Sequence, residues 1–188
     1  TDLWGRPVFV TLLNSIKEKW ASERERLVKS GEEFAQYIRE ETQKKSSEKH
    51  ALDESVIQSA YEQFDSRFDT EKGGFGDAPK FPQSHGLSFL LRYWKRVREP
   101  NALVMVEKTL DEMAKGGMYD QLGGGFHRYS TDSEWRVPHF EKMLYDQAIL
   151  SKSYLEAYQA TKNENDARIA REIFDYVLRD MTGPEGAF

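Results

Sequence analysis

Cysteine is absent from the 188 residues of this sequence. Without a thiol the chain can form no disulfide, no thiolate nucleophile and no Cys-ligated zinc site. Long apolar runs are missing as well, since none approaches the roughly 18–20 residues that span a membrane. No signal-peptide pattern is found. These absences make a cytoplasmic setting the default expectation and predict no membrane partner.

A block of basic residues is also lacking. The 27 Lys and Arg are outnumbered by 32 Asp and Glu, which gives a formal net charge of −5. Nucleic-acid binding needs a clustered positive surface that neutralises phosphates, so we expect no nucleic-acid partner. The run Gly123–Gly125 lacks the Gly-Lys-Ser/Thr of a phosphate-binding loop, and no strand pattern precedes it. We therefore predict no cofactor.

Helical periodicity is what the sequence has in abundance. Almost no segment alternates with a period of two, whereas apolar residues recur every three to four positions, which predicts an all-α chain. Residues 9–38 indicate one long helix or two collinear ones, followed by a polar linker at 43–50. Asp53 is a plausible N-cap for the next helix. Further helices are expected at about 53–68, 84–98, 101–115, 138–160 and 166–179.

An internal repeat organises these helices. The pair Gly74-Phe75 recurs as Gly125-Phe126 and as Ala187-Phe188, at intervals of 51 and 62 residues. A repeat of this length predicts stacked helix pairs, each of which needs neighbours to cover its apolar face. Such pairs suit a ring of helical hairpins. We therefore predict an incomplete (α/α)6 toroid that contains about half of the ring.

The connection Gly116–Leu144 is the segment richest in chemical groups. It combines three consecutive glycines with two histidines, aromatic rings and charges of both signs. Loops between packed helices are normally short, so this one indicates a concave polar and aromatic site. We select four candidate catalytic residues and five candidate substrate-binding residues in it or next to it. The former are His127, His139, Glu141 and Asp146, and the latter are Arg128, Tyr129, Asp132, Trp135 and Tyr145.

The two histidines admit two interpretations. An imidazole titrates near neutrality and can act as a general acid or base, with Glu141 or Asp146 orienting it. A helix that starts at Pro138 would place His139, Lys142 and Asp146 on one face. The alternative is structural, with the glycines letting the backbone turn and His139 bonding the helix start. As zinc ligands the histidines lack a third partner at a recognised spacing, so no metal is predicted.

Three segments carry a resemblance to a known family. They are GGFGDAPKFPQ at 73–83, KGGMYDQLGGGFHRYSTDSEWRVPHFEKMLYDQA at 115–148 and GPEGAF at 183–188. Together they resemble the helical portion of the YyaL-type family of thioredoxin-domain-containing proteins, which includes the mammalian spermatogenesis-associated thioredoxin-like protein. The second segment matches without a gap. The resemblance covers most of the chain from about residue 50 onward.

The resemblance implies a domain organisation. In this family an N-terminal thioredoxin-like domain precedes an (α/α)6 toroid similar to N-acylglucosamine 2-epimerases and other six-hairpin glycosidase-like enzymes. Residues 1–45 would then be a helix that closes or links from an absent thioredoxin-like domain. Residues 46–188 would be the first half of the toroid, truncated at its C-terminus. The missing parts of the same full-length chain are the expected partners, and uncovered helix faces predict self-association.

The resemblance also implies hypotheses about function. Related epimerases use histidines to move a proton beside a sugar carbonyl, and His127 and His139 are the residues here that could do so. The first hypothesis is therefore a domain that binds or processes a carbohydrate-like small molecule, as a sugar isomerase or hydrolase. The second is a non-catalytic binding or scaffold domain attached to a thioredoxin-like redox domain. The third assigns all chemistry to that missing domain. In each case we expect the piece alone to be inactive.

Overall fold

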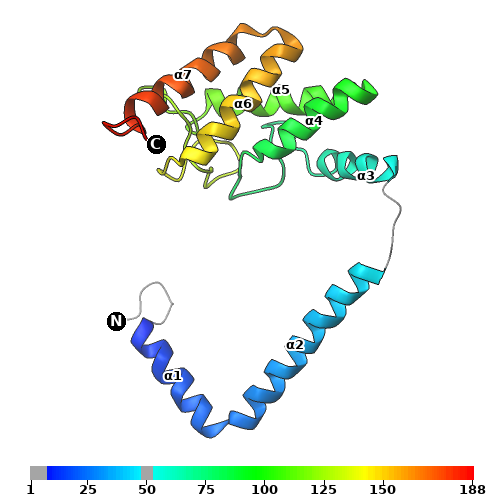
Figure 1. Ribbon diagram of the computed structural model, residues 1–188, viewed down its shortest axis with the longest axis vertical. Coiled ribbons are helices and arrows are strands. Elements are labelled where there is room, and N and C mark those ends of the chain that lie inside the picture. Colours follow the sequence, from blue (N-terminus) through cyan, green and yellow to red (C-terminus); the bar gives the residue numbers. More distant parts are fainter. Residues whose placement is uncertain (1–7, 48–52) are drawn as a thin grey trace. The chain divides into compact units, whose positions relative to one another are not determined.

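A computed structural model describes residues 8–47 and 53–188 of the chain (Figure 1). Within these residues the regular structure is helical, and loop residues form four isolated β-bridges but no strand. The all-α prediction is confirmed. The helices are α1 Phe9–Ser22, α2 Arg24–Ser47, α3 Glu54–Asp65, α4 Ser84–Val97, α5 Pro100–Lys115, α6 Leu144–Thr161 and α7 Glu164–Asp180.

The chain divides into two compact units, Thr1–Ala51 and Leu52–Phe188. In the first unit Glu23 leaves the helical conformation, with φ −131° and ψ 28°, so of the two predicted alternatives, one long helix or two collinear ones, the chain forms two helices. The ribbon changes direction there, and the helices are not collinear (Figure 1). Helix α2 continues to Ser47 and takes up part of the predicted linker. The rest of that linker lies outside the described residues.

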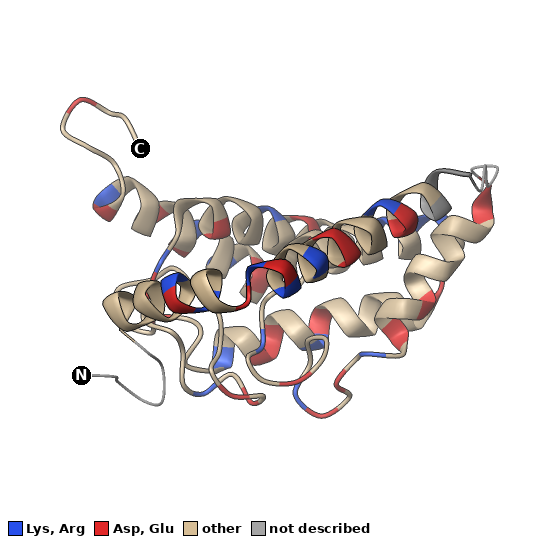
Figure 2. Cartoon of the chain, turned by 90° about the horizontal axis from the view of Figure 1, so that it is seen from below, with Lys and Arg blue, Asp and Glu red and all other residues tan. Residues whose placement is uncertain are grey.

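The second unit is built from antiparallel helical hairpins, α4 with α5 and α6 with α7. Helices α4 and α6 lie side by side and run parallel, because their contacts advance together along both. The Ser153 hydroxyl donates to the Ser84 carbonyl (3.3 Å), and the Ser88 hydroxyl donates to Glu156 (3.2 Å). Figure 2 shows charged residues of both signs distributed over the helices. The predicted helical hairpins are therefore present.

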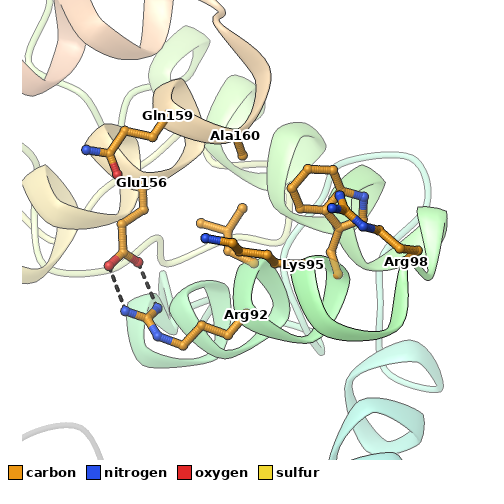
Figure 3. Close-up of a pocket in the computed structure, with 8 residues that line it drawn as sticks. Arg92, Lys95, Arg98, Glu156, Gln159 and Ala160 are labelled. Carbon is orange, nitrogen blue, oxygen red and sulfur yellow. Dashed lines mark hydrogen bonds and ion pairs between the residues drawn. The ribbon is translucent and has the colours of Figure 1, made fainter.

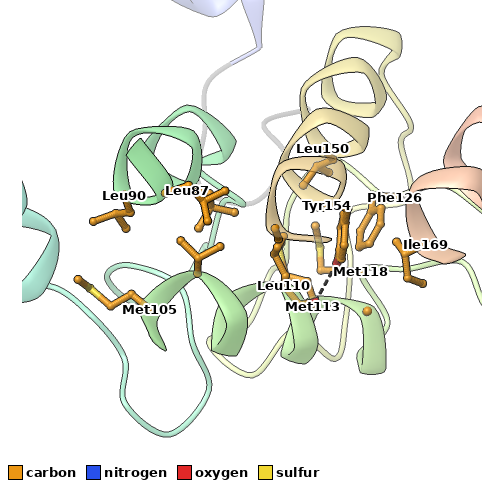
Figure 4. Close-up of a cluster of buried hydrophobic side chains, with 14 of the residues drawn as sticks. Leu87, Leu90, Met105, Leu110, Met113, Met118, Phe126, Leu150, Tyr154 and Ile169 are labelled. Carbon is orange, nitrogen blue, oxygen red and sulfur yellow. Dashed lines mark hydrogen bonds between the residues drawn. The ribbon is translucent and has the colours of Figure 1, made fainter. Parts of the chain in front are cut away.

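Side chains from all four hairpin helices form one buried core (Figure 4). Leu87, Leu110 and Leu150 have no exposed surface or almost none. Each such side chain contributes about 1.5–3 kcal/mol through its removal from water. The hydroxyl of buried Tyr154 donates to the carbonyl of Leu110 at 2.8 Å, so the polar end of this side chain is also satisfied. The core thereby fixes where the N-terminal ends of α4 and α6 lie.

The helix expected from Pro138 begins six residues later, at Leu144. The intervening chain pairs with the loop before it: the N–H of His139 donates to the carbonyl of Tyr129, and the N–H of Arg128 to that of Glu141, both at 2.8 Å. These backbone groups are therefore satisfied outside a helix. The prediction that His139, Lys142 and Asp146 share one helix face is wrong for this reason.

The first Gly-Phe pair lies in a tight turn that we call the first corner, residues 69–80. One carboxylate oxygen of Asp69 accepts the backbone N–H groups of Glu71 and Lys72. The other accepts the ammonium of Lys80 at 2.6 Å. Lys80 also donates to the carbonyl of Gly73 at 2.8 Å, which closes the turn.

The second corner, residues 120–142, repeats this arrangement. Asp120 accepts the N–H groups of Leu122 and Gly123 with one oxygen and the Lys142 ammonium with the other, at 2.8 Å. Lys142 then donates to the carbonyl of Gly124 at 2.8 Å. The equivalent contacts confirm the 51-residue repeat predicted from the first two Gly-Phe pairs.

An aromatic ring covers each corner. The Lys80 ammonium lies 5.2 Å from the centroid of the Trp135 ring, and the Lys142 ammonium lies 4.2 Å from that of Tyr176. The glycine beneath each ring has a positive φ. A Cβ atom on it would come within 2.5 Å of the ring, on Trp135 in the first corner and on Tyr176 in the second. Only glycine fits these two positions.

Candidate functional site

The two corners differ in the length of chain between their phenylalanine and their lysine. Lys80 follows Phe75 by five residues, whereas Lys142 follows Phe126 by sixteen. The whole segment between Phe126 and Lys142, residues 127–141, is here called the excursion. It is tied to the first corner, because Lys80 and Ser130 exchange backbone hydrogen bonds at 2.8 and 2.9 Å. The polar segment singled out in the sequence is thus an anchored loop that joins both corners.

A charged cluster lies at the two ends of the excursion. The Arg128 guanidinium lies 3.0 Å from Oε2 of Glu141, and Nδ1 of His139 lies 3.6 Å from the same oxygen. All three side chains keep between 38% and 47% of their surface exposed. One carboxylate therefore faces both a permanent cation and an imidazole that remains accessible to solvent.

A stack of three rings supports the imidazole. The ring of Tyr129 stacks on His139 at a centroid distance of 4.8 Å and on Phe81 at 4.7 Å. Phe81 directly follows the first corner and is 44% exposed. It was not among the predicted residues, because a phenylalanine between two loop residues shows no periodicity that would mark it. The site therefore draws on both corners.

Asp146 lies next to the cluster, in the first turn of α6. Its Oδ2 atom is buried and has no hydrogen-bond partner among the described residues. Burial raises the pKa of this carboxyl; Arg128 opposes the rise, and the negative charge of Glu141 adds to it. The neighbouring Tyr145 is 49% exposed. The pKa of Asp146 consequently lies above that of an exposed aspartate.

His127 has different surroundings from His139. Its ring meets the ring of Phe140 edge-on at 5.2 Å, and its Nδ1 atom is buried without a hydrogen-bond partner among the described residues. Burial, and then the positive charge of Lys142, lower the pKa of this imidazole. His127 is therefore neutral at pH 7. The two histidines do not form one chemical unit.

The structure corrects two of the predicted substrate-binding residues. Trp135 is fully buried, and its indole N–H donates to the carbonyl of Lys72 at 2.8 Å, so its ring has no free face for a ligand. The carboxylate of Asp132 accepts the backbone N–H groups of Glu134 and Val137 at 2.7 and 2.6 Å. Both side chains hold the excursion in shape, which is why such polar and aromatic residues occur in it.

The remaining predicted residues other than His127 come together. Arg128 and His139 both lie against Glu141, and Tyr129 stacks on His139. Asp146 and Tyr145 act electrostatically on the Arg128 guanidinium. Within residues 8–47 and 53–188, no three His, Asp or Glu side chains are grouped so that they could hold a metal ion. No helix in that part of the chain is long and apolar enough to cross a membrane.

Comparison with known proteins identifies relatives along the whole chain. No family model matches the sequence. The chain is 38% identical over 193 residues to an uncharacterised protein of Caenorhabditis elegans. It is 39% identical over 186 residues to spermatogenesis-associated protein 20 of Homo sapiens and of Mus musculus. The predicted resemblance is confirmed. These alignments cover 96–100% of this chain but only 24–26% of the relatives, so the chain spans about a quarter of their length.

Solved structures of the same architecture are sugar epimerases. They include a sugar epimerase from a ruminal bacterium (17% identity, TM-score 0.59) and the cellobiose 2-epimerases of Bacillus thermoamylovorans (14%, 0.59) and Spirochaeta thermophila (18%, 0.58). The match covers 70% of this chain and 37–39% of theirs. At such low identity the likeness shows the fold alone. The predicted incomplete (α/α)6 toroid is thereby confirmed.

Proposed function

We propose that the cluster around His139 binds and processes a carbohydrate-like small molecule, as part of a larger sugar-acting isomerase or hydrolase. The observation that carries this proposal is the pairing of an exposed imidazole with the Glu141 carboxylate at 3.6 Å. The solved sugar epimerases support it only as an analogy of fold. The resemblance to their architecture directs attention to sugars as the first ligands to test.

The geometry suits proton transfer. Because Nδ1 of His139 faces Glu141, Nε2 lies on the opposite edge of the ring and is the atom that would meet a substrate. A base there could take the proton from the carbon beside a sugar carbonyl, which gives a planar enediolate. Inversion of that centre requires a proton on the opposite face, either after the intermediate turns over or from a second acid. The carboxylate would stabilise the imidazolium that forms. Arg128 holds this carboxylate in place from the other side.

Neighbouring groups would complete such a site. The pKa of Asp146 is raised by burial, and in its protonated form this carboxyl could donate a hydrogen bond to the carbonyl oxygen as negative charge develops there. The exposed rings of Tyr145 and Phe81 offer apolar surface to the carbons of a sugar. A few polar groups on an aromatic surface is the usual composition of a small-molecule site.

A second candidate function is a non-catalytic binding or scaffold domain attached to a thioredoxin-like redox domain. The observation that favours it is how many excursion residues are used internally. Trp135 and Asp132 hold the loop, and the His127 ring packs edge-on to Phe140. On this view the Arg128–Glu141 pair braces the loop rather than serving a reaction.

A ligand screen on the chain separates the two candidates. We expect at least one compound among cellobiose, monosaccharides and sugar phosphates to raise the melting temperature, because a ligand at 100 times its Kd adds about 2.7 kcal/mol to stability. Glu141→Gln should abolish the shift by misorienting His139. The exposed His85 on α4, outside the cluster, provides the control His85→Ala, which should retain it.

Catalysis is tested by deuterium incorporation beside the sugar carbonyl in D2O, followed by mass spectrometry. The assay uses this chain and human spermatogenesis-associated protein 20 with the matching substitutions. We expect His139→Ala to lower the rate by about 10²–10⁴, the usual effect of losing a general acid or base. Exchange that is unchanged in His139→Ala would eliminate the catalytic assignment. A complete absence of sugar binding would favour the scaffold function.

A further inference from the structure

A groove lies between the C-terminal ends of α4 and α6, at the ends of these helices that are remote from the excursion. Its volume is about 450 Å³, within the range of small-molecule pockets. Arg92, Lys95 and Arg98 of α4 line one side, and Glu156 and Gln159 of α6 line the other (Figure 3). The groove shares no lining residue with the cluster around His139. It is therefore a separate feature of the molecule.

One cation of this groove is already neutralised. The guanidinium of Arg92 forms two parallel bonds to the carboxylate of Glu156, at 2.8 and 2.9 Å, and the Ser88 hydroxyl donates to the same carboxylate. The pair is visible as two dashed lines in Figure 3. It fixes the wall of the groove and leaves Glu156 with its acceptors in use.

The other two cations have no carboxylate partner. Among the described residues, Lys95 makes no ion pair, and its ammonium extends along the groove between the two helices (Figure 3). The Arg98 guanidinium lies 5.3 Å from the ring centroid of Trp94 and likewise pairs with no acid in the described part of the chain. An excess of positive charge thus lines one hollow of a protein whose net charge is −5. Such a hollow attracts anions.

We propose that this groove binds a small organic phosphate, with Lys95, Arg98 and the Gln159 amide contacting the phosphate oxygens. A planar guanidinium and a mobile ammonium match phosphate geometry. The apolar wall, which includes Leu91 and Ala160, is available to the organic part of the ligand. The groove is too small for a macromolecular partner, which favours a metabolite-sized ligand.

A structural role is the competing explanation for these cations. Basic residues in the last turn of a helix stabilise its C-terminal end through the helix dipole, and Lys95 and Arg96 occupy the last turn of α4. Arg96 supplies the matched control, since it has the same charge, lies next to Lys95 and pairs with Glu54 at 2.6 Å outside the groove. A dipole effect would treat Lys95 and Arg96 alike. A phosphate site would not.

The experiment titrates the chain with inorganic phosphate and with glucose 6-phosphate at constant ionic strength. Binding is followed by NMR through the Gln159 side-chain amide and the Trp94 indole N–H. We expect saturable shifts, at least a tenfold rise in Kd for Lys95→Gln combined with Arg98→Gln, and less than a twofold change for Arg96→Gln. His139→Ala should leave the phosphate affinity unchanged, which separates this site from the proposed function. Helix content by circular dichroism checks that each variant folds.

Two results would overturn the proposal. One is the absence of saturation with either compound. The other is an equal loss of affinity in Arg96→Gln, which would mean a diffuse charge effect. Glucose 6-phosphate should bind more tightly than inorganic phosphate because its sugar meets the apolar wall, and glucose alone should not bind. An affinity no better than that of inorganic phosphate would disprove the contact with the organic part.

Discussion

Lys80 is the least ordinary single residue of the molecule, because its side chain is completely buried. Its ammonium has three acceptors: Asp69 at 2.6 Å and the carbonyls of Gly73 and Ser133, both at 2.8 Å. All three N–H donors are therefore satisfied. A buried charge is tolerated only under such conditions, and removal of one partner leaves the others without compensation.

We predict that Lys80→Met lowers the free energy of unfolding by about 3–5 kcal/mol, because Asp69 and two carbonyls lose their donor. The equivalent Lys142→Met should cost less, since 14% of the Lys142 side chain is exposed and water can reach Asp120. Urea denaturation of both variants gives the comparison. A larger loss of unfolding free energy in Lys142→Met than in Lys80→Met would contradict this interpretation of the two corners.

How far single residues were predictable depended on the range of their contacts. Asp53 was recognised as an N-cap because its partner, the N–H of Ser55, is two residues away. Lys80 was not singled out, because one of its acceptors is 53 residues distant. The contact of His139 with Glu141 was within reach of sequence reasoning because both belong to one short segment. The burial of Trp135 could not be predicted from the sequence, because it depends on packing against the distant first corner.

At the scale of elements, helix boundaries followed the same rule. The range predicted for α4, 84–98, differs by one residue from Ser84–Val97, because Pro82 and Pro100 mark its two ends in the sequence. The start of α6 was misplaced by six residues. Pro138 is a valid helix-start signal, but pairing with the preceding loop satisfied the backbone there first. The helix-start signal of Pro138 was therefore overridden by backbone hydrogen bonds that form only when the excursion folds.

The corner as an element is tested at its glycine. Gly125 has φ 76°, and a Cβ atom there would lie 2.5 Å from the Tyr176 ring. We expect Gly125→Ala to destabilise the second unit by about 2–4 kcal/mol through backbone strain and displacement of that ring. The control is Gly31→Ala in α2, where an added Cβ atom would meet no neighbouring group within 4 Å. This substitution should increase helix stability by about 0.5–1 kcal/mol. Thermal unfolding followed by circular dichroism measures both. A neutral Gly125→Ala would refute the strain argument.

At the scale of the whole molecule, stability depends on carboxyls with opposite shifts. Asp166, buried at the start of α7, has its pKa raised to about 6, first by burial and then by the charges of Asp111 and Glu107. Asp120 has its pKa lowered, first by the N–H of Gly123 and then by Lys142. The folded state therefore binds the Asp166 proton more tightly than the unfolded chain does, and the Asp120 proton less tightly.

These shifts fix the sign of the pH dependence. As the pH falls from 7.5 toward 5, protonation of Asp166 should raise the free energy of unfolding by roughly 1–1.5 kcal/mol. Below about pH 4 the contribution of Asp120 is lost and stability should fall again. Urea denaturation between pH 3 and 8 measures the profile. In Asp166→Asn the rise between pH 7.5 and 5 should vanish; a rise that persists would show that another group causes it.

The chain as a whole spans about a quarter of its relatives, and its described part exposes large apolar side chains such as Leu122 and Phe140, which are 100% and 80% exposed. The self-association predicted from the sequence and the role of a thioredoxin-like domain stay predictions. The fold could be predicted because its repeating unit can be recognised twice in the amino-acid sequence. The ligand could not, because it depends on which side chains remain accessible after packing.

The aromatic cover of each corner has a consequence for how the second unit loses its structure. Trp135, which covers the first corner, lies within the second corner, and Tyr176, which covers the second, belongs to α7 of the hairpin that follows it. We therefore expect each corner to lose its aromatic cover when the part of the chain that follows it unfolds. These contacts between consecutive repeats should make their unfolding cooperative. They also hold the excursion in place while the hairpins are folded.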